Sequence, residues 1–308
     1  MSAHPIELTG LTKVYGSSKA LDGIDLVVSE GSVYGFLGPN GAGKTTTLRI
    51  LSGLARPTTG RARVLGVDVG AAGNDIRARI GFLPDVPGFY EWMTAEEFLR
   101  FAGRLFGLPA AVLDERVEAL LDLAGLTGVT TKVGAYSRGM KQRLGVAQAL
   151  INAPALLMLD EPTSALDPIG RKEVLDMIAS LAGRTTVFFS THILSDVERV
   201  CDTVAILDRG RVVVQAPVEE LKNRYGARKV ILEVTCGTEA LSRRFSAESW
   251  VTAVACESRT LTLTVSDIEA ARLAIPAAVV AEKAGLVRLE GGEVSLEEVF
   301  VGLVGGAQ

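Results

Sequence analysis

Residues 38–45 read GPNGAGKT, which fits the pattern G-x-x-x-x-G-K-[ST]. Glycines in such a loop let successive backbone N–H groups turn toward phosphate oxygens, and the positive end of a following helix adds to the attraction. Lys44 would place a cation on the β- and γ-phosphates, and the Thr45 hydroxyl could ligate Mg²⁺. Because the strand-like run SVYGFL precedes the loop and a helical pattern follows it, we prefer this interpretation to a chance match in a glycine-rich chain. The predicted phosphate-binding residues are Gly38, Pro39, Asn40, Gly41, Ala42, Gly43, Lys44, Thr45 and Thr46.

Two adjacent carboxylates, Asp160 and Glu161, end the apolar run ALLMLD. Such a run is expected of a strand that is buried on both faces of a parallel sheet. Standing alone, the pair is equally well explained as an ordinary turn at the end of a strand. Beside a phosphate loop, Asp160 would hold the Mg²⁺ shell, and Glu161 would orient or deprotonate an attacking water.

His192 follows another apolar run, TTVFFS, whereas the second histidine, His4, lies in the N-terminal tail. A lone histidine is more often structural than catalytic. However, Gly38, Asp160 and His192 all lie where predicted strands end, and open α/β sheets bind ligands at the carboxyl ends of their strands. We therefore predict that His192 senses the γ-phosphate.

The elements that must position these residues follow from the hydrophobic pattern. Residues 1–35 alternate with period two and are broken by glycine, which predicts strands and hairpins. After the loop, the spacing of Leu48, Leu51 and Leu54 predicts that they share one helix face. Residues from about 88 to 150 read as helices, and strand–helix alternation then resumes. The pattern predicts an α/β layer sheet with a helical insertion.

The chain changes character near residues 221–227. Two strand-like runs, VILEVT and TLTLTV, precede a helical pattern at about 267–284 and the strand-like run LVRLE. These elements suffice for a small α+β domain of about 80 residues. We therefore expect two domains, 1–224 and 225–308.

The bulk composition excludes several classes of protein. The net charge of -4, with no long basic cluster, gives no reason to expect a nucleic-acid partner. Three widely spaced cysteines indicate a reduced, cytosolic protein without disulfides or zinc. The N-terminus lacks the apolar region of a signal peptide, and no apolar run approaches the ~20 residues of a membrane helix. Any membrane association is therefore expected to come through a partner.

Taken together, these residues resemble the ATP-binding cassette (ABC) ATPases, the nucleotide-binding subunits of ABC transporters. GPNGAGKTT is similar to their Walker A motif, and LLMLDEP to Walker B with Glu161 as catalytic glutamate. SALD, which ends at Asp167, resembles the D-loop, and His192 the switch histidine. Tyr15, in KVYG, resembles the aromatic residue that stacks on adenine, although a plain loop tyrosine is the alternative. The resemblance covers about residues 6–222 and implies a P-loop NTPase sheet, an N-terminal antiparallel β subdomain, and ATP and Mg²⁺ as ligands.

The stretch YSRGMKQRL (Tyr136 to Leu144) resembles the ABC signature, with Arg138 in place of the usual first glycine. In that family the helix N-terminus faces the γ-phosphate held by another subunit. The Ser137 hydroxyl, the N–H of Gly139 and the helix dipole would together attract an anion. The resemblance implies a head-to-tail homodimer around two ATP molecules. The alternative is an ordinary capped surface helix.

Asp85 occupies the position where the family carries its Q-loop glutamine. An aspartate would still offer an oxygen to Mg²⁺ or to its water, but it adds a negative charge and lacks the amide donor. A turn aspartate after Pro84 is the alternative.

The resemblance implies an ATPase on the cytoplasmic face of the cell membrane, peripheral to separate integral membrane permease subunits. Family members receive a coupling helix in the insertion at about 88–150, where Phe89, Tyr90 and Trp92 cluster; the alternative is that these aromatics only seal the insertion. The ending SLEEVFVGLV resembles the accessory domain of exporters of the drug- and antibiotic-resistance type. A non-transport ABC protein of DNA repair or translation would show coiled coils, two cassettes or a basic surface. A plain P-loop kinase or GTPase does not explain the signature, D-loop and histidine together.

Overall fold

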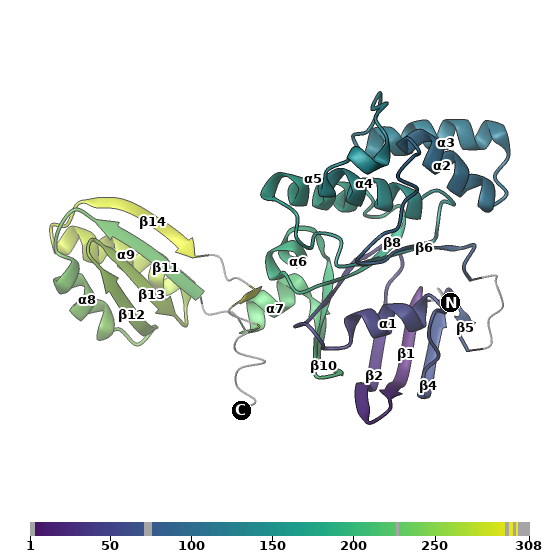
Figure 1. Ribbon diagram of the computed structural model, residues 1–308. Coiled ribbons are helices and arrows are strands. Elements are labelled where there is room, and N and C mark those ends of the chain that lie inside the picture. The colour runs from purple at the N-terminus through teal and green to yellow at the C-terminus, as the bar shows by residue number, and fades with distance from the viewer. Residues whose placement is uncertain (1–3, 71–75, 226–227, 293–295, 298–299, 301–308) are drawn as a thin grey trace. The chain divides into compact units, whose positions relative to one another are not determined.

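The computed structural model describes residues 4–70, 76–225, 228–292, 296, 297 and 300 (Figure 1). The chain divides into two compact units, Met1–Val218 and Glu219–Gln308, and each is described by itself. Helix α7 (Val218–Tyr225) begins at this division, and the boundary expected from the sequence falls near its end. Within the described ranges, no helix has both the length and the apolarity that crossing a membrane requires.

The N-terminal sheet is antiparallel, with strand order β2-β1-β4-β5. Its strands are β1 (Ile6–Tyr15), β2 (Ser18–Val28), β4 (Thr59–Val64) and β5 (Val67–Asp68). Strands β1 and β2 form a hairpin that closes where Tyr15 pairs with Ser18. Alternate residues such as Ile6 and Leu8 are buried, as the period-two pattern predicts.

The central sheet has six strands in the order β10-β9-β3-β8-β7-β6. Its bounds are β3 (Val33–Leu37), β6 (Ile80–Leu83), β7 (Leu156–Asp160), β8 (Thr186–Thr191), β9 (Thr203–Asp208) and β10 (Arg211–Pro217). All neighbours are parallel except β9 and β10. Because β8 lies between β3 and β7, the carboxyl ends of these three strands meet at one edge.

Strands β7 and β8 separate two hydrophobic cores. Leu157 and Phe189 pack into a cluster with the apolar residues of the helical insertion. Met158 and Phe188 point the other way, into a cluster with the N-terminal sheet and the helix after the phosphate loop. Burial on both faces explains why these strands are continuous apolar runs.

Helix α1 (Lys44–Leu51) ends earlier than predicted. Leu48 and Leu51 are buried, but Gly53 adopts a left-handed φ of 72°, which does not continue a helix. Leu54 lies beyond this point and is 62% exposed. The prediction that Leu54 shares the buried helix face was therefore wrong.

The helical insertion contains α2 (Ala95–Leu105), α3 (Ala110–Leu123) and α4 (Arg138–Ala149), which lie together in Figure 1. Helix α2 begins with a capping box formed by Thr94 and Glu97. Helices α5 (Pro168–Ala179) and α6 (Leu194–Val200) then return the chain to the central sheet. The predicted α/β layer sheet with a helical insertion is confirmed.

The C-terminal unit contains a four-stranded antiparallel sheet in the order β12-β13-β11-β14. Its elements are β11 (Arg228–Val234), α8 (Thr238–Ser246), β12 (Val251–Glu257), β13 (Thr260–Val265), α9 (Ile268–Ala281) and β14 (Leu286–Gly292). The sequence patterns did not predict α8 or β12. Most of the segment SLEEVFVGLV lies outside the described residues.

Candidate functional site

The predicted phosphate loop joins β3 to α1, and its glycines are required by close packing. A Cβ atom on Gly38 would lie 2.3 Å from the carbonyl oxygen of Leu207. At Gly43, where φ is 111°, a Cβ would lie 2.7 Å from the carbonyl oxygen of Ala20. Any side chain at either position would displace backbone, so glycine is needed there for steric reasons.

Lys44 lies beneath this loop and is 5% exposed. Its ammonium donates to the carbonyl oxygens of Gly38 at 2.7 Å and Pro39 at 3.2 Å. The same nitrogen lies 3.1 Å from Oε1 of Glu161. The ammonium therefore donates two hydrogen bonds, and its charge is paired with a carboxylate.

A pocket of about 230 Å³ opens over the loop. It is lined by Ala20, Asn40, Gly41, Gly43, Lys44, Thr45, Thr46, Asp85 and Glu161. The structure thus brings six of the nine predicted loop residues, the carboxylate of Glu161 and that of Asp85 around one space.

Asp160 ends β7 and is 1% exposed. Its Oδ1 accepts hydrogen bonds from the Ser190 hydroxyl at 2.6 Å and the Thr45 hydroxyl at 3.3 Å. Burial raises the pKa of this carboxyl, and the negative charges of Asp85 and Glu161 add to the shift. The hydrogen bonds oppose it, but the pKa of Asp160 remains above its ordinary value. A nearby cation would favour the charged form.

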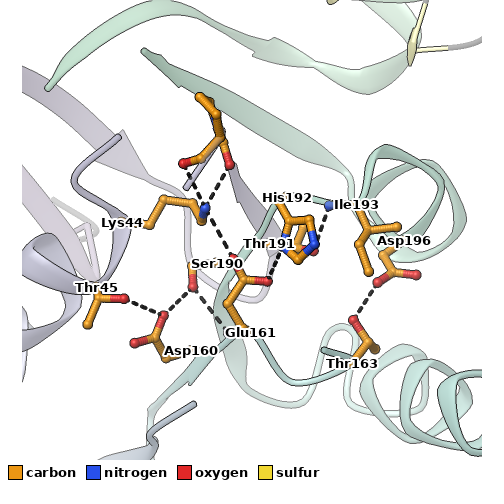
Figure 2. A network of polar contacts seen from close by, with 12 residues as sticks. Lys44, Thr45, Asp160, Glu161, Thr163, Ser190, Thr191, His192, Ile193 and Asp196 are labelled. Atoms are coloured by element: carbon orange, nitrogen blue, oxygen red, sulfur yellow. Dashed lines mark hydrogen bonds and ion pairs between the residues drawn. The ribbon is translucent and has the colours of Figure 1, made fainter. Parts of the chain in front are cut away.

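Glu161 follows Asp160 and lies between two nitrogen groups (Figure 2). One carboxylate oxygen contacts Lys44, and the other lies 2.8 Å from Nδ1 of His192. Its backbone has a left-handed φ of 49°, which is uncommon for a residue with a side chain. The Glu161 side chain is 11% exposed, against 42% for His192, so the carboxylate lies inside the site and the imidazole at its opening.

Ser190 belongs to the site although the sequence reading gave it no role. Besides binding Asp160, its hydroxyl and its carbonyl oxygen both accept from the backbone N–H of Glu161, at 3.2 and 3.1 Å. The parallel register pairs Asp160 with Ser190 directly across β7 and β8. The sequence offers one signal for this role, because Ser190 is a polar residue at the end of the apolar run TTVFFS.

Two other helix starts, which carry the predicted residues Ser137, Gly139 and Asp167, do not line this pocket. The Ser137 hydroxyl accepts from the N–H of Met140 at 3.2 Å and caps α4. Asp167 caps α5 in the same way, through the N–H of Gly170 at 3.2 Å. A Cβ on Gly139 would lie 3.5 Å from Cα of Gly170, so these two helix starts are close neighbours.

Tyr15 also lies outside the residues that line the pocket. It ends β1 and is 47% exposed. The ammonium of Lys13 lies 4.6 Å from the centre of its ring, a cation–π contact on one face.

Comparison with known proteins bears on what this arrangement does. A family model described as "ABC transporter" matches residues 21–164. The chain is 40% identical over 306 residues to the uncharacterized ABC transporter ATP-binding protein YxlF of Bacillus subtilis, with 97% of this chain and 99% of that protein covered. It is 45% identical over 222 residues to the bacitracin transport ATP-binding protein BcrA of Bacillus licheniformis, covering 71% and 72%. It is 41% identical over 231 residues to the daunorubicin/doxorubicin resistance ATP-binding protein DrrA of Streptomyces peucetius, covering 74% and 70%.

Solved structures give the same picture of the fold. An ATP-binding subunit of an ABC transporter matches with a TM-score of 0.64 and 30% identity, covering 71% of this chain and 92% of that one. The cassette MJ0796, solved as a dimer in a post-hydrolysis state with ADP and phosphate, matches with a TM-score of 0.63 and 26% identity, covering 69% and 98%. These matches confirm the predicted fold class for the N-terminal unit.

Proposed function

The chain belongs to the ATP-binding proteins of ABC transporters rather than to the non-transport ABC ATPases, and from that premise we propose how its residues bind and hydrolyse ATP. The loop from Gly38 to Thr46 binds the phosphates, and Glu161 orients or deprotonates the attacking water. His192 contacts the γ-phosphate. One observation carries the assignment: the Glu161 carboxylate lies between the ammonium of Lys44 and the imidazole of His192, at the wall of the pocket above the loop.

The contacts of Lys44 imply an exchange when ATP enters. Its ammonium forms an ion pair with the carboxylate of Glu161. The β- and γ-phosphate oxygens would compete for that ammonium. Phosphate binding would then release the Glu161 carboxylate to accept a proton from water, while His192 stays close to it.

The oxygen groups beside the loop fit Mg²⁺. The Thr45 hydroxyl and the Asp160 carboxylate are 3.3 Å apart, and Asp85 lines the same pocket. Mg²⁺ prefers oxygen ligands and usually binds through one or two protein groups plus phosphates and waters. Within the described residues, no cluster of three or more His, Cys, Asp and Glu side chains forms a closed metal cage, so phosphate oxygens would complete the shell. Bound there, Mg²⁺ would neutralise charge on the phosphates.

We further propose that two copies of the chain close around two ATP molecules. Ser137, Gly139 and Asp167 lie outside the chain's own pocket, which leaves them available to a nucleotide held by a second copy. MJ0796 was solved as a dimer, and a twofold pair is the simplest assembly of a chain with one cassette. Tyr15 is proposed to stack on adenine through the ring face opposite Lys13.

The proposed partner is an integral membrane permease, with this chain peripheral on the cytoplasmic face. The aromatic cluster at the start of the insertion divides into a half-buried and an exposed part. Phe89 packs edge-on against Phe98 with ring centres 5.2 Å apart, whereas Tyr90 and Trp92 are 41% and 67% exposed. We propose that Phe89 seals the insertion and that Tyr90 and Trp92 contact the permease.

Similarity to BcrA and DrrA supports export of a drug or antibiotic as the transport task. Residues 1–224 would then form the ATPase domain and residues 225–308 an accessory domain.

Glu161→Gln tests the hydrolytic assignment. The amide keeps the shape of the side chain but lacks a basic carboxylate, so turnover should fall by about 100-fold or more while ATP binding persists. Phosphate release and nucleotide binding would be measured on the full chain. Asp176→Asn is a matched control, because it removes a surface carboxylate bound to Arg199 at 2.7 Å. Near-normal turnover of Glu161→Gln would exclude Glu161 as the base.

A further inference from the structure

Asp196 is a buried carboxylate that the functions described above do not use. It belongs to α6 and has no exposed surface. One oxygen, Oδ2, accepts from the hydroxyl of Thr163 at 2.5 Å, and the other, Oδ1, accepts from Nε of Arg171 at 2.6 Å. The Arg171 guanidinium also donates to the hydroxyl of Ser195 at 2.7 Å. A buried carboxylate is strongly destabilising without such partners, so its presence calls for a reason.

The contact between Thr163 and Asp196 joins the same two chain segments as the contact between Glu161 and His192. Glu161 and Thr163 both lie just after β7, and His192 and Asp196 both lie just after β8. Figure 2 shows the two contacts, with the one between Thr163 and Asp196 to the lower right of the one between Glu161 and His192. Only short stretches of chain separate the two contacts. The hydrogen bond between Thr163 and Asp196 therefore limits where Glu161 can lie relative to His192.

Asp196 also holds the segment after β7 at two points. Thr163 is near the start of that segment, and Arg171 lies in the first turns of α5. Between them the backbone is unusual, because Ala165, like Glu161, has a left-handed φ, here 51°. Residues with side chains keep such conformations only where surrounding contacts enforce them. The two bonds of Asp196 are contacts of that kind.

We propose that Asp196, together with Thr163 and Arg171, is a positioning group for ATP hydrolysis that fixes Glu161 against His192. This inference rests on the roles proposed above for those two residues. Asp196 does not touch the nucleotide pocket and acts only through the loop that it holds. A displacement of about 1 Å in a reacting group can cost about 100-fold in rate, so a loss of this contact should appear in kcat.

The test is Thr163→Val, which keeps the shape of the side chain but removes its hydroxyl. We expect kcat for Mg²⁺–ATP to fall by about 10- to 100-fold, with KM and equilibrium ATP binding unchanged. Thr163→Ser retains a hydroxyl and should restore most of the rate. The matched control is Thr186→Val, at the other end of β8, where the Thr186 hydroxyl is buried and accepts from the N–H of Gly31 at 2.9 Å. The control loses one buried hydrogen bond and should keep its kcat.

Several outcomes would overturn the proposal. They are a normal kcat in Thr163→Val, an equal loss of kcat in Thr163→Ser, and an equal loss in the Thr186→Val control. If Thr163→Val does not fold, Arg171→Lys is compared with Arg199→Lys, whose guanidinium binds Asp176 on the surface. A lysine cannot reproduce the paired contacts of Arg171 to Asp196 and Ser195, so only Arg171→Lys should lose kcat. Equal rates in these two variants would likewise overturn the proposal.

Measuring Glu161→Gln in parallel distinguishes a failure of the catalytic assignment of Glu161 from a failure of the positioning role of Asp196. If Glu161→Gln turns over normally, the proposed catalytic assignment fails. If Glu161→Gln is inactive and Thr163→Val is normal, only the positioning role of Asp196 fails.

Discussion

The phosphate loop and the segment Tyr136–Leu144, called the signature segment below, both lie at helix starts, but their surroundings differ. At the loop, Lys44 and Thr45 contact groups at the carboxyl ends of two separate strands, β3 and β7. At the signature segment, the hydroxyl of Ser137 bonds within its own helix turn. The phosphate loop thus contacts other elements of its own chain, whereas the signature segment has a local cap only. The difference indicates that a helix N-terminus becomes a whole site only when other elements converge on it.

The largest effect is expected when the phosphate loop is mutated in one chain of a dimer and the signature segment in the other. Lys44→Ala removes the buried cation from a chain's own loop, and Ser137→Arg blocks the signature segment that would serve the partner. Each homodimer should fail to occlude ATP, with a loss of affinity in Lys44→Ala of about thirtyfold or more. A mixed dimer has one site with both lesions and one with neither, so occlusion should return there. The measurement is nucleotide occlusion in purified dimers carrying two different tags.

Hydrolysis in the mixed dimer is a weaker criterion, because paired sites can be coupled. Wild-type homodimer mixed in the same way is the control for assembly. Occlusion in the mixed dimer no better than in either mutant homodimer would mean that Ser137 is an ordinary helix cap.

A smaller effect is expected from the buried carboxyl group of Asp160, which lies beside the phosphate loop. The pKa of Asp160 is raised above its ordinary value of 3.8, so folding takes up a proton between the ordinary and the raised pKa. Stability of the nucleotide-free chain should therefore fall as pH rises through that window. Asp160→Asn removes the titrating group and should raise Tm at neutral pH by roughly 2–4 °C per kcal/mol that the buried charge costs. Thermal unfolding across pH checks both points.

The same Asp160→Asn variant should lose magnesium-dependent turnover, because it lacks the carboxylate oxygen proposed for the ion. Asp176→Asn, at an exposed ion pair, is the control and should leave the pH profile unchanged. A lower Tm in Asp160→Asn would contradict the view that its charge is disfavoured in the folded chain.

The smallest effect is expected from removing the residues after Tyr225, which supply no predicted ATP-site residue. A chain that ends after Tyr225 should keep basal ATPase activity within about threefold of the full chain, because separate compact units often fold alone. ATP-dependent dimerisation should persist and would be followed by light scattering. A soluble, folded truncation that had lost both properties would show that the C-terminal unit helps to form the dimer.

The sequence predicted most of what lies along one stretch of chain. The phosphate-loop motif and the carboxylates after β7 were recognisable from residues adjacent in the sequence, although the packing that requires Gly38 and Gly43 involves Leu207 and Ala20. The roles of Ser190 and Asp196 could not be predicted in this way, because they depend on β8 lying beside β7. Adjacency of strands is decided by the whole fold, and a single sequence carries little signal for it.

The missed elements have local explanations. Strand β12 has no fully buried residue, so its sequence lacks the alternation that marks a half-buried strand. Helix α8 buries only Leu241 and Phe245, too few to give a clear helical period. Leu54 was misplaced because the helix signal was continued through Gly53.

The ion pair between Lys44 and Glu161 has a consequence for inhibitor chemistry. A compound that enters the pocket without negative charge meets an ammonium already neutralised by a carboxylate, and it gains nothing from displacing either group. Useful affinity at this point requires an anion that replaces Glu161 on the lysine. Neutral compounds have better prospects at the pocket beside Trp92 and Phe101, where the aromatic side chains offer contact area and the ion pair between Lys132 and Glu97 lies at an exposed position.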